Sequence, residues 1–196
     1  RGRVSFSDEL EMVVGKISDW PYFAKWHYRG HGIGPVRRVN LLLHRGRKVG
    51  ICIFGFGPLA SSHRNRLFGL GGKMSSSKAR LVNENFACVS RLVLAPAYRG
   101  AGIASDFLAR ACQAAPWPWI ELISEMANLV PFYKSAGFIL AGRNEPRTKS
   151  KSENGPGRSF WGKSNWTDAT YAKYKTRTRH SRPAYCIRDN RRQVRG

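Results

Sequence analysis

A glycine-rich turn stands where an apolar stretch of the sequence meets a segment with helical spacing. The turn reads YRGAGIA, from Tyr98 to Ala104, and follows the strand-like run CVSRLVLAP. A strand that enters such a turn and then a helix places backbone N–H groups and the positive end of the helix dipole around one concavity. Glycine permits a positive φ and a close approach of the backbone, and Arg99 adds a positive charge. The pattern predicts a phosphate-binding site.

Two common phosphate motifs do not explain this turn. A P-loop requires GxxxxGK(S/T), and a dinucleotide fingerprint requires GxGxxG with an acidic residue about twenty positions on. The sequence has neither pattern here. In its context, the turn resembles the acyl-CoA-binding turn of the GNAT acyltransferases, which reads Gln/Arg-x-x-Gly-x-Gly/Ala directly after the fourth strand. Arg99, Gly102 and Ala104 fall on the patterned positions.

A second block of sequence extends the resemblance. The segment ANLVPFYKSAGF is similar to the family's Asn-x-x-x-x-x-Tyr-x-x-x-Gly-Phe segment. The resemblance covers roughly residues 11–142. It implies an α/β protein with the GNAT fold, a mixed central β-sheet flanked by helices, and a basic C-terminal extension. Residues 1–142 would form the acyltransferase core, and residues 143–196 would complete the sheet and bind nucleic acid.

The family likeness also implies a cofactor, acetyl-CoA or another acyl-CoA, and the residues that bind it. The pantetheine would pair like an extra strand with the backbone of the central strand, and the pyrophosphate would lie on the turn. Tyr133 would protonate the departing thiolate, although a tyrosine at this position can instead pack beneath the sheet. The implied cofactor-binding residues are Leu92, Val93, Leu94, Arg99, Gly100, Ala101, Gly102, Ile103, Ala104 and Asn128.

The segment WHYRGHG places His27 and Tyr28 at the end of the first expected helix, where members of this fold shape the acceptor pocket. This His-Tyr pair resembles a block of the phage Mom family, GNAT-like enzymes that modify adenine in DNA. The run GICIFGFGPLA and the pair Ser90 and Arg91 are similar to the same group. The likeness implies that His27 and Tyr28 act in catalysis and that the acceptor is an exocyclic amine of a nucleobase.

Members of that group carry an aspartate just after the fifth strand, where this chain reads SEMAN. Glu125 is the nearest carboxylate, and a carboxylate at a strand end can accept a proton from an amine or a water. His27, Glu125 and Tyr133 would together form an acid–base set or a facial metal site, for which the Mom likeness implies iron. A histidine at a helix end can also be a packing residue.

The charge of the chain predicts a polyanionic partner. Lys and Arg number 34 against 12 Asp and Glu, for a formal net charge of +22, which is typical of proteins that bind nucleic acid. We expect DNA, with RNA or a nucleic-acid-bound protein as alternatives, contacted by a basic loop and an aromatic-rich tail. The candidate nucleic-acid-binding residues are Arg64, Arg66, Lys73, Lys78, Arg80, Trp161, Trp166, Lys173, Lys175, Arg177 and Arg179.

Composition indicates a folded protein in a reducing compartment. The chain is 42% hydrophobic, enough to form a core. Cys52, Cys88, Cys112 and Cys186 are scattered and form no CxxC pair, so we expect core thiols. With no long apolar stretch and no signal-peptide pattern, we expect a cytoplasmic protein without a membrane segment, in keeping with a phage protein acting in its host.

The elements that must position these residues can be read from local pattern. We expect a strand over 11–17, a helix capped by Ser18, a hairpin with its turn at HRGRK, and a long basic loop over 58–85. A central strand, a helix, a buried strand, a short helix ending at Gly137 and another strand follow, and PAYCIRD is the last strand.

Three functions remain open at this stage. The first is a GNAT-fold transferase that modifies a nucleobase amine in DNA from acyl-CoA or a related donor. The second is an acetyl-CoA-dependent N-acetyltransferase acting on a protein, RNA or a small amine. The third is a catalytically inactive GNAT-like protein that binds nucleic acid.

Overall fold

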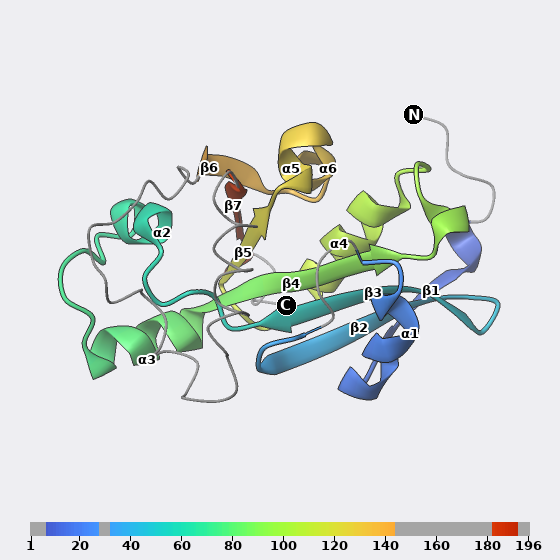
Figure 1. Ribbon diagram of the computed structural model, residues 1–196, viewed down its shortest axis with the longest axis horizontal. Coiled ribbons are helices and arrows are strands. Elements are labelled where there is room, and N and C mark those ends of the chain that lie inside the picture. The colour runs from blue at the N-terminus through green and yellow to red at the C-terminus, as the bar shows by residue number, and fades with distance from the viewer. Residues whose placement is uncertain (1–6, 28–31, 144–181, 192–196) are drawn as a thin grey trace, which may run out of the picture.

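The computed structural model describes residues 7–27, 32–143 and 182–191. Within these ranges, seven strands form one sheet in the order β1-β2-β3-β4-β5-β7-β6 (Figure 1). Strands β4 and β5 are parallel, and the other neighbouring strands are antiparallel. The strands are β1 Leu10–Val14, β2 Val36–His44, β3 Arg47–Gly55, β4 Phe86–Leu94, β5 Trp119–Ser124, β6 Ile139–Arg143 and β7 Ala184–Asp189. The expected mixed sheet is confirmed.

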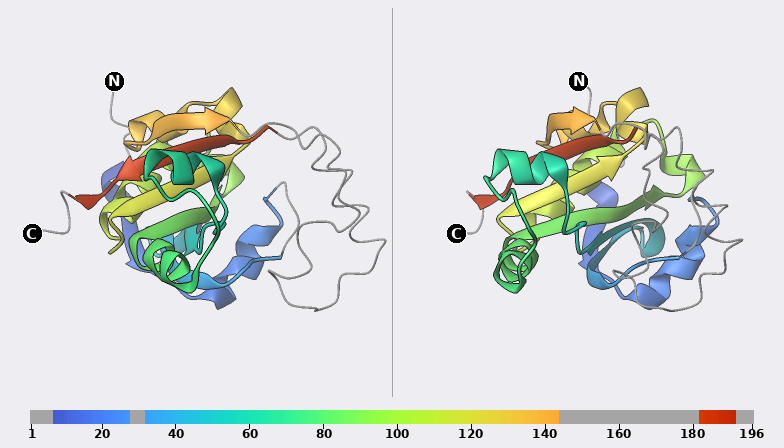
Figure 2. Two further views of the ribbon diagram at one scale, coloured as in Figure 1. Left: turned by 90° about the vertical axis from the view of Figure 1, so that its left-hand side faces the viewer. Right: turned by 60° about the vertical axis from the view of Figure 1, so that its left-hand side comes forward.

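Helices cover both faces of this sheet (Figure 2). They are α1 Trp20–Ala24, α2 Ser62–Leu67, α3 Ser76–Asn85, α4 Ile103–Gln113, α5 Met126–Leu129 and α6 Phe132–Ser135, with short 3-10 turns η1 Ser7–Glu9, η2 Ile17–Asp19 and η3 Pro96–Tyr98. Alternate residues of β4 show the two faces. Ala87 and Val89 join the main core with Phe107 of α4, whereas Phe86 belongs to a smaller cluster on the opposite face.

The N-terminal half follows the predicted order with one shift at the first helix. Helix α1 begins at Trp20, after η2, so Ser18 is not its cap. The side chain of Asp19 instead accepts a hydrogen bond from the Lys16 N–H at 2.8 Å. The hairpin is confirmed, because β2 and β3 are joined at Arg45 (φ 48°) and Gly46 (φ 75°). Two consecutive positive φ angles characterise a type I′ turn, whose twist matches that of the strands it joins.

The stretch from 58 to 85 was predicted to be a loop, and that prediction is wrong. It contains α2 and α3, and each helix begins with a serine cap. The Ser61 Oγ accepts from the Arg64 N–H at 3.4 Å, and the Ser75 Oγ accepts from the Lys78 N–H at 3.2 Å. Among the side chains of α3, Val82 is the one that is buried, so the segment lacks the apolar periodicity by which a helix is usually recognised.

The C-terminal strand lies inside the sheet. Strand β7 pairs with β5 through Leu122↔Cys186 and with β6 through Leu140↔Cys186, both antiparallel. The predicted last strand is therefore present, and it separates two strands that precede it in the sequence. Residues 184–189 thus belong to the same sheet as the predicted core.

The cysteines behave as small apolar residues. All four are free and buried. Burial raises the pKa of Cys112 to about 12 and the pKa of Cys186 to about 11, which keeps these thiols protonated at neutral pH. Separately, no helix among the described residues has both the length and the apolar character needed to cross a membrane.

Candidate functional site: an open strand edge and a glycine turn

The pairing between strands β4 and β5 ends partway along β4. Their parallel ladder ends at Val89↔Leu122, although β4 continues to Leu94 (Figure 1). The register with β3 also shifts between Ile53 and Phe54 at this level, and the Ser90 Oγ donates to the Ile53 carbonyl at 3.0 Å. A β-bulge bends the strand that carries it. Within the described part of the chain, the edge of β4 that faces β5 therefore has no strand beside it after Val89, as far as Leu94.

The register shows which backbone groups face this open edge. The Ala95 N–H donates to the Val49 carbonyl at 2.8 Å, so the pair of Ala95 and Val49 is a hydrogen-bonded one. Because such pairs alternate along an antiparallel ladder, Val93 also directs its N–H and C=O toward β3. Leu92 and Leu94 direct theirs away from β3. The predicted contact of a cofactor with the Val93 backbone does not fit this register.

The turn after β4 has the conformation that the sequence predicts. Gly100 (φ 86°) and Gly102 (φ 79°) adopt the left-handed region, and nothing lies within 4 Å of a Cβ built on either. Gly102 is the N-cap of α4, and its carbonyl accepts from the N–H groups of Ser105 at 3.1 Å and Asp106 at 3.3 Å. The first N–H groups of a helix have no partner within it. Those of Ile103 and Ala104 are thus available to an anion beside open space.

Arg99 ties this turn to helix α1. Its Nε donates to the Leu94 carbonyl and its Nη2 donates to the Trp26 carbonyl, both at 3.1 Å. Its backbone N–H donates to Pro96 at 3.2 Å. The guanidinium thus holds the end of β4 against the end of α1. We call the backbone of Leu92 and Leu94 together with residues 99–104 the donor corner.

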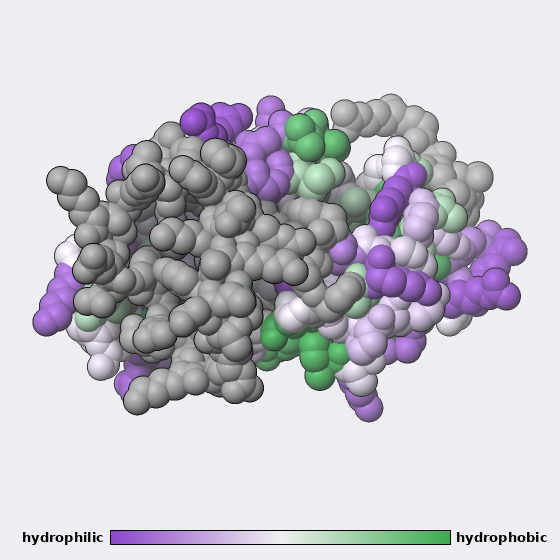
Figure 3. All heavy atoms as spheres, in the orientation of Figure 1, coloured by the Kyte–Doolittle hydropathy of each residue, from purple (hydrophilic) through white to green (hydrophobic). Residues whose placement is uncertain are grey.

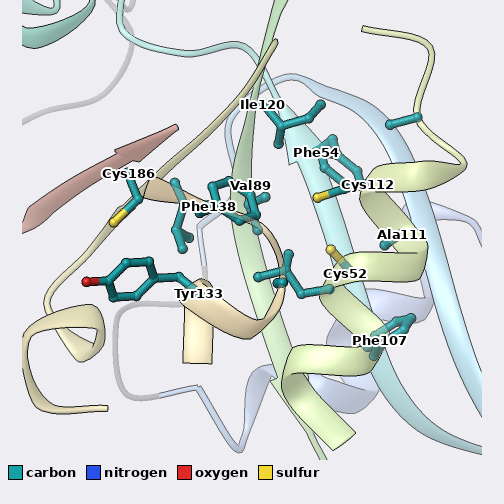
Figure 4. Close-up of a cluster of buried hydrophobic side chains, with 14 of the residues drawn as sticks. Cys52, Phe54, Val89, Phe107, Ala111, Cys112, Ile120, Tyr133, Phe138 and Cys186 are labelled. Carbon is teal, nitrogen blue, oxygen red and sulfur yellow. The ribbon is translucent and has the colours of Figure 1, made fainter. Parts of the chain in front are cut away.

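Tyr133 lies in the main core beneath α4, on helix α6. It is 4% exposed, and Figure 4 shows its ring beside Phe138 with the hydroxyl pointing away from Val89 and Phe107. Among the described residues, no protein group forms a hydrogen bond with this hydroxyl. Its ring therefore packs as a core side chain, while the phenol oxygen is left for a contact outside the core. Its role as an acid stays a prediction.

The other predicted catalytic residues lie on different elements. The His27 ring packs edge-on against Trp20 at 5.7 Å, on the face of the sheet covered by α1. Glu125 follows β5 and precedes α5, and Tyr28 lies outside the described residues. The described His, Cys, Asp and Glu side chains include no group of three that could hold a metal ion. The donor set therefore gives no support to iron.

Asn128 is occupied by structural contacts. Its Nδ2 donates to the Arg182 carbonyl at 2.9 Å, and its Oδ1 accepts from Arg143 Nε at 3.1 Å. The side chain thus joins the end of β6 to the segment that leads into β7. Its predicted contact with a cofactor stays a prediction.

Arg64 does not belong to a nucleic-acid surface. The side chain is 0% exposed, as is that of Glu121, and the two form an ion pair at 3.1 Å. Arg64 Nη2 donates to the carbonyls of Pro58 at 2.5 Å and Leu59 at 2.6 Å. The prediction that Arg64 contacts phosphate is wrong, because its charge is enclosed in the protein.

Glu121 and Tyr185 complete this buried group, and the sequence analysis missed both. The Tyr185 hydroxyl donates to Glu121 Oε1 at 2.5 Å, and a Cβ at Gly57 would lie 2.2 Å from Glu121 Oε2. Burial raises the pKa of Glu121, and the charge of Arg64 acts against that rise. A glutamate inside the apolar run WIELIS is the one signal that a buried partner exists. We call α2, α3 and the Arg64, Glu121 and Tyr185 network the insertion face.

The other basic candidates have separate outcomes. Arg66, Lys73 and Arg80 are exposed. Lys78 Nζ donates to the Gly71 carbonyl at 2.5 Å, which engages its charge locally. The predicted tail residues, Trp161, Trp166, Lys173, Lys175, Arg177 and Arg179, lie outside the described residues. Binding of nucleic acid by the exposed side chains stays a prediction.

Comparison with known proteins establishes the fold. No protein-family model matches the sequence, and no curated protein matches it. A chimera of the spermidine N-acetyltransferase SpeG from Vibrio cholerae and hSSAT aligns with a TM-score of 0.54 and 10% identity, over 96% of this chain and 99% of that chain. A GNAT family acetyltransferase from Elizabethkingia anophelis with acetyl-CoA bound aligns at 0.50 and 10%, over 93% and 99%. AAC(6')-Ib with acetyl-CoA aligns at 0.51 and 12%, over 96% and 97%. The chain has the GNAT fold.

Proposed function

We propose that this protein is an acyl-CoA-dependent N-acyltransferase whose acceptor is an amine on a nucleic acid. The observation that carries the first half is the donor corner: a strand edge that none of the described strands pairs with, which leads into a glycine turn and a helix N-terminus. A molecule with amides at one end and a pyrophosphate at the other is complementary to both parts. Bound there, acyl-CoA would supply a thioester for attack by an amine.

The protein's own groups have defined tasks in this reaction. The outward N–H groups of Leu92 and Leu94 can donate to amide or thioester carbonyls, and the N–H groups at the start of α4 can hold phosphate oxygens. The Tyr133 hydroxyl can hold the proton that a departing sulfur needs. The core packing around the Tyr133 ring supports this role, because it restricts the movement of the donor oxygen.

Charge favours a nucleic acid as the acceptor. The described carboxylates are largely engaged: Glu9 by Arg45 at 2.5 Å, Asp19 by Lys48 at 2.6 Å and Asp189 by Arg191 at 2.7 Å. The carboxylates are too few to neutralise the basic side chains, because 34 Lys and Arg stand against 12 Asp and Glu. Hydrophilic side chains also cover much of the described surface visible in Figure 3. A nucleobase amine in DNA is the narrower form of this proposal, and a protein or small amine is the alternative.

Binding of acetyl-CoA tests the donor half. Gly102→Asp places a carboxylate where the phosphate would lie, so we expect calorimetry to show at least a roughly 100-fold loss of affinity. Gly46→Asp is a matched control, because Gly46 also has a positive φ (75°) with nothing near its Cβ and lies in the β2–β3 turn. Equal affinity of the two variants would contradict the assignment of the donor corner.

A scan of acceptors tests the second half. Labelled acetyl-CoA would be offered with DNA, RNA, protein and polyamines, and nucleosides from DNA of expressing cells would be analysed by mass spectrometry. The proposal expects label or added mass on nucleic acid. Label on a polyamine or a protein alone, with unmodified nucleosides, would overturn the nucleic-acid half and leave the donor half intact.

A further inference from the structure

Tyr22 of α1 and Lys25, which follows the helix, are exposed and lie beside the half-buried ring of Trp26. Tyr22 is 49% exposed, and its ring lies 5.4 Å from that of Trp26 at an interplanar angle of 85°. Lys25 Nζ lies 5.1 Å from the centre of the Tyr22 ring and 4.7 Å from that of Trp26. Lys25 is exposed, and none of the described carboxylates pairs with it. The three side chains thus combine an apolar face with an unneutralised cation.

This group adjoins the donor corner through a chain of contacts. The Trp26 carbonyl accepts from Arg99 Nη2, and the same guanidinium donates through Nε to the Leu94 carbonyl. On the far side of the residues that follow α1, the Gly32 carbonyl accepts from Arg91 Nη2 at 2.6 Å. Both arginines belong to β4 or to the turn after it. The end of α1 is therefore fixed beside the open edge of β4.

A second exposed aromatic with a cation shows what a purely structural arrangement looks like. Phe56 is 45% exposed, and the Arg37 guanidinium lies 4.6 Å from its ring centre and 4.2 Å from that of Trp117. Arg37 Nη1 also donates to the Phe86 carbonyl at 2.6 Å. That cation is bound to the backbone and packed on a core tryptophan. Lys25 has no such anchor, so its ammonium can turn to an external anion.

We propose that Tyr22, Lys25 and Trp26 form a binding surface for an unstacked nucleobase of a single-stranded nucleic acid, with Lys25 on a neighbouring phosphate. The proposal rests on the proposed function in one respect, because it names where the acceptor strand is held. Aromatic side chains bind bases through their π faces with little sequence preference, and cations beside them neutralise the backbone. The net charge of the chain supplies the complementary field.

The test is fluorescence anisotropy with a labelled single-stranded DNA, in the absence of acyl-CoA and over a range of salt concentrations. Tyr22→Ala is expected to weaken binding roughly 5- to 100-fold and to leave the salt slope unchanged, because the lost contact is uncharged. Lys25→Gln is expected to reduce the slope of log K against log salt by about 0.7. Phe56→Ala is the matched control and is expected to bind like the parent. Tyr22→Leu, which keeps apolar packing against Phe23, guards against loss of folding.

The outcomes separate this inference from the proposed function. If Tyr22→Ala and Tyr22→Leu bind the single-stranded DNA as tightly as Phe56→Ala does, the proposed surface on α1 is overturned. The same holds if the parent protein does not bind the single strand. Calorimetry with acetyl-CoA on the same preparations measures the affinity of the donor corner independently. Failure there, together with the expected DNA result, would reject acyl transfer and retain the binding surface.

Discussion

The donor corner and the insertion face are built from different parts of the polypeptide. In the donor corner, the groups that face a ligand are the backbone N–H groups of Leu92, Leu94 and the start of α4. In the insertion face, the contacts are side chain to side chain, between Arg64, Glu121 and Tyr185. Main-chain sites depend on conformation and tolerate side-chain change, whereas a buried ionic network depends on each member.

This difference in construction explains why the donor corner could be predicted from the sequence and the insertion face could not. The strand, turn and helix of the donor corner are contiguous, and the two glycines with positive φ are visible in the sequence as the motif itself. The partner of Glu121 lies 57 residues away, among 34 basic residues that the composition does not distinguish. Local pattern therefore identifies one region and not the other.

The largest effect should come from breaking the insertion face. Glu121→Leu leaves the Arg64 guanidinium buried without a counter-charge, and an arginine does not escape this by losing its proton. We expect a loss of about 3–5 kcal/mol in the free energy of unfolding, measured by denaturant titration. Arg64→Met should cost less, because Glu121 can take up a proton.

Two controls define that result. The double variant Arg64→Met with Glu121→Leu should recover most of the lost stability, because it removes both charges and fills the same volume. Glu84→Leu, at an exposed glutamate of α3, should change stability by less than about 0.5 kcal/mol. A single variant Glu121→Leu as stable as Glu84→Leu would show that the ion pair does not hold α2 to the sheet.

Elsewhere in the fold, features determined by adjacent residues could also be predicted from the sequence, whereas features determined by distant contacts could not. The β2–β3 hairpin was predictable, since Arg45 and Gly46 lie between two strand-like runs. Helices α2 and α3 were not, because each buries one side chain, Arg64 in α2 and Val82 in α3, and the partner of Arg64 is the distant Glu121. The register of residues 92–94 against β3 determines which of their backbone groups face the open edge, and spacing along one strand does not contain that information.

Removal of the Tyr133 hydroxyl and removal of the Tyr185 hydroxyl should have opposite effects on turnover and stability. Tyr133→Phe is expected to lower kcat for acyl transfer roughly 100-fold, with the KM for acyl-CoA and the stability nearly unchanged, because the lost group is a proton donor. Tyr185→Phe should leave kcat unchanged and cost about 1–3 kcal/mol of stability, because buried Glu121 loses a hydrogen bond. Thiol release and denaturant titration measure the two. Equal turnover of Tyr133→Phe and the parent would remove Tyr133 from the mechanism.

The smallest expected effect is a pH dependence confined to the insertion face. Because burial raises the pKa of Glu121, the stability linked to this group is fully present below the pKa of an unfolded glutamate and is lost as the pH rises through the higher folded pKa. The free energy of unfolding of the parent, minus that of Glu121→Gln, should therefore fall from about pH 4 toward neutrality. The donor corner binds through uncharged backbone groups of this chain, so acetyl-CoA affinity per folded molecule should not follow that difference. If this difference in the free energy of unfolding rises with pH instead, the charge of Arg64 outweighs the effect of burial on the pKa of Glu121 and holds its carboxylate ionised.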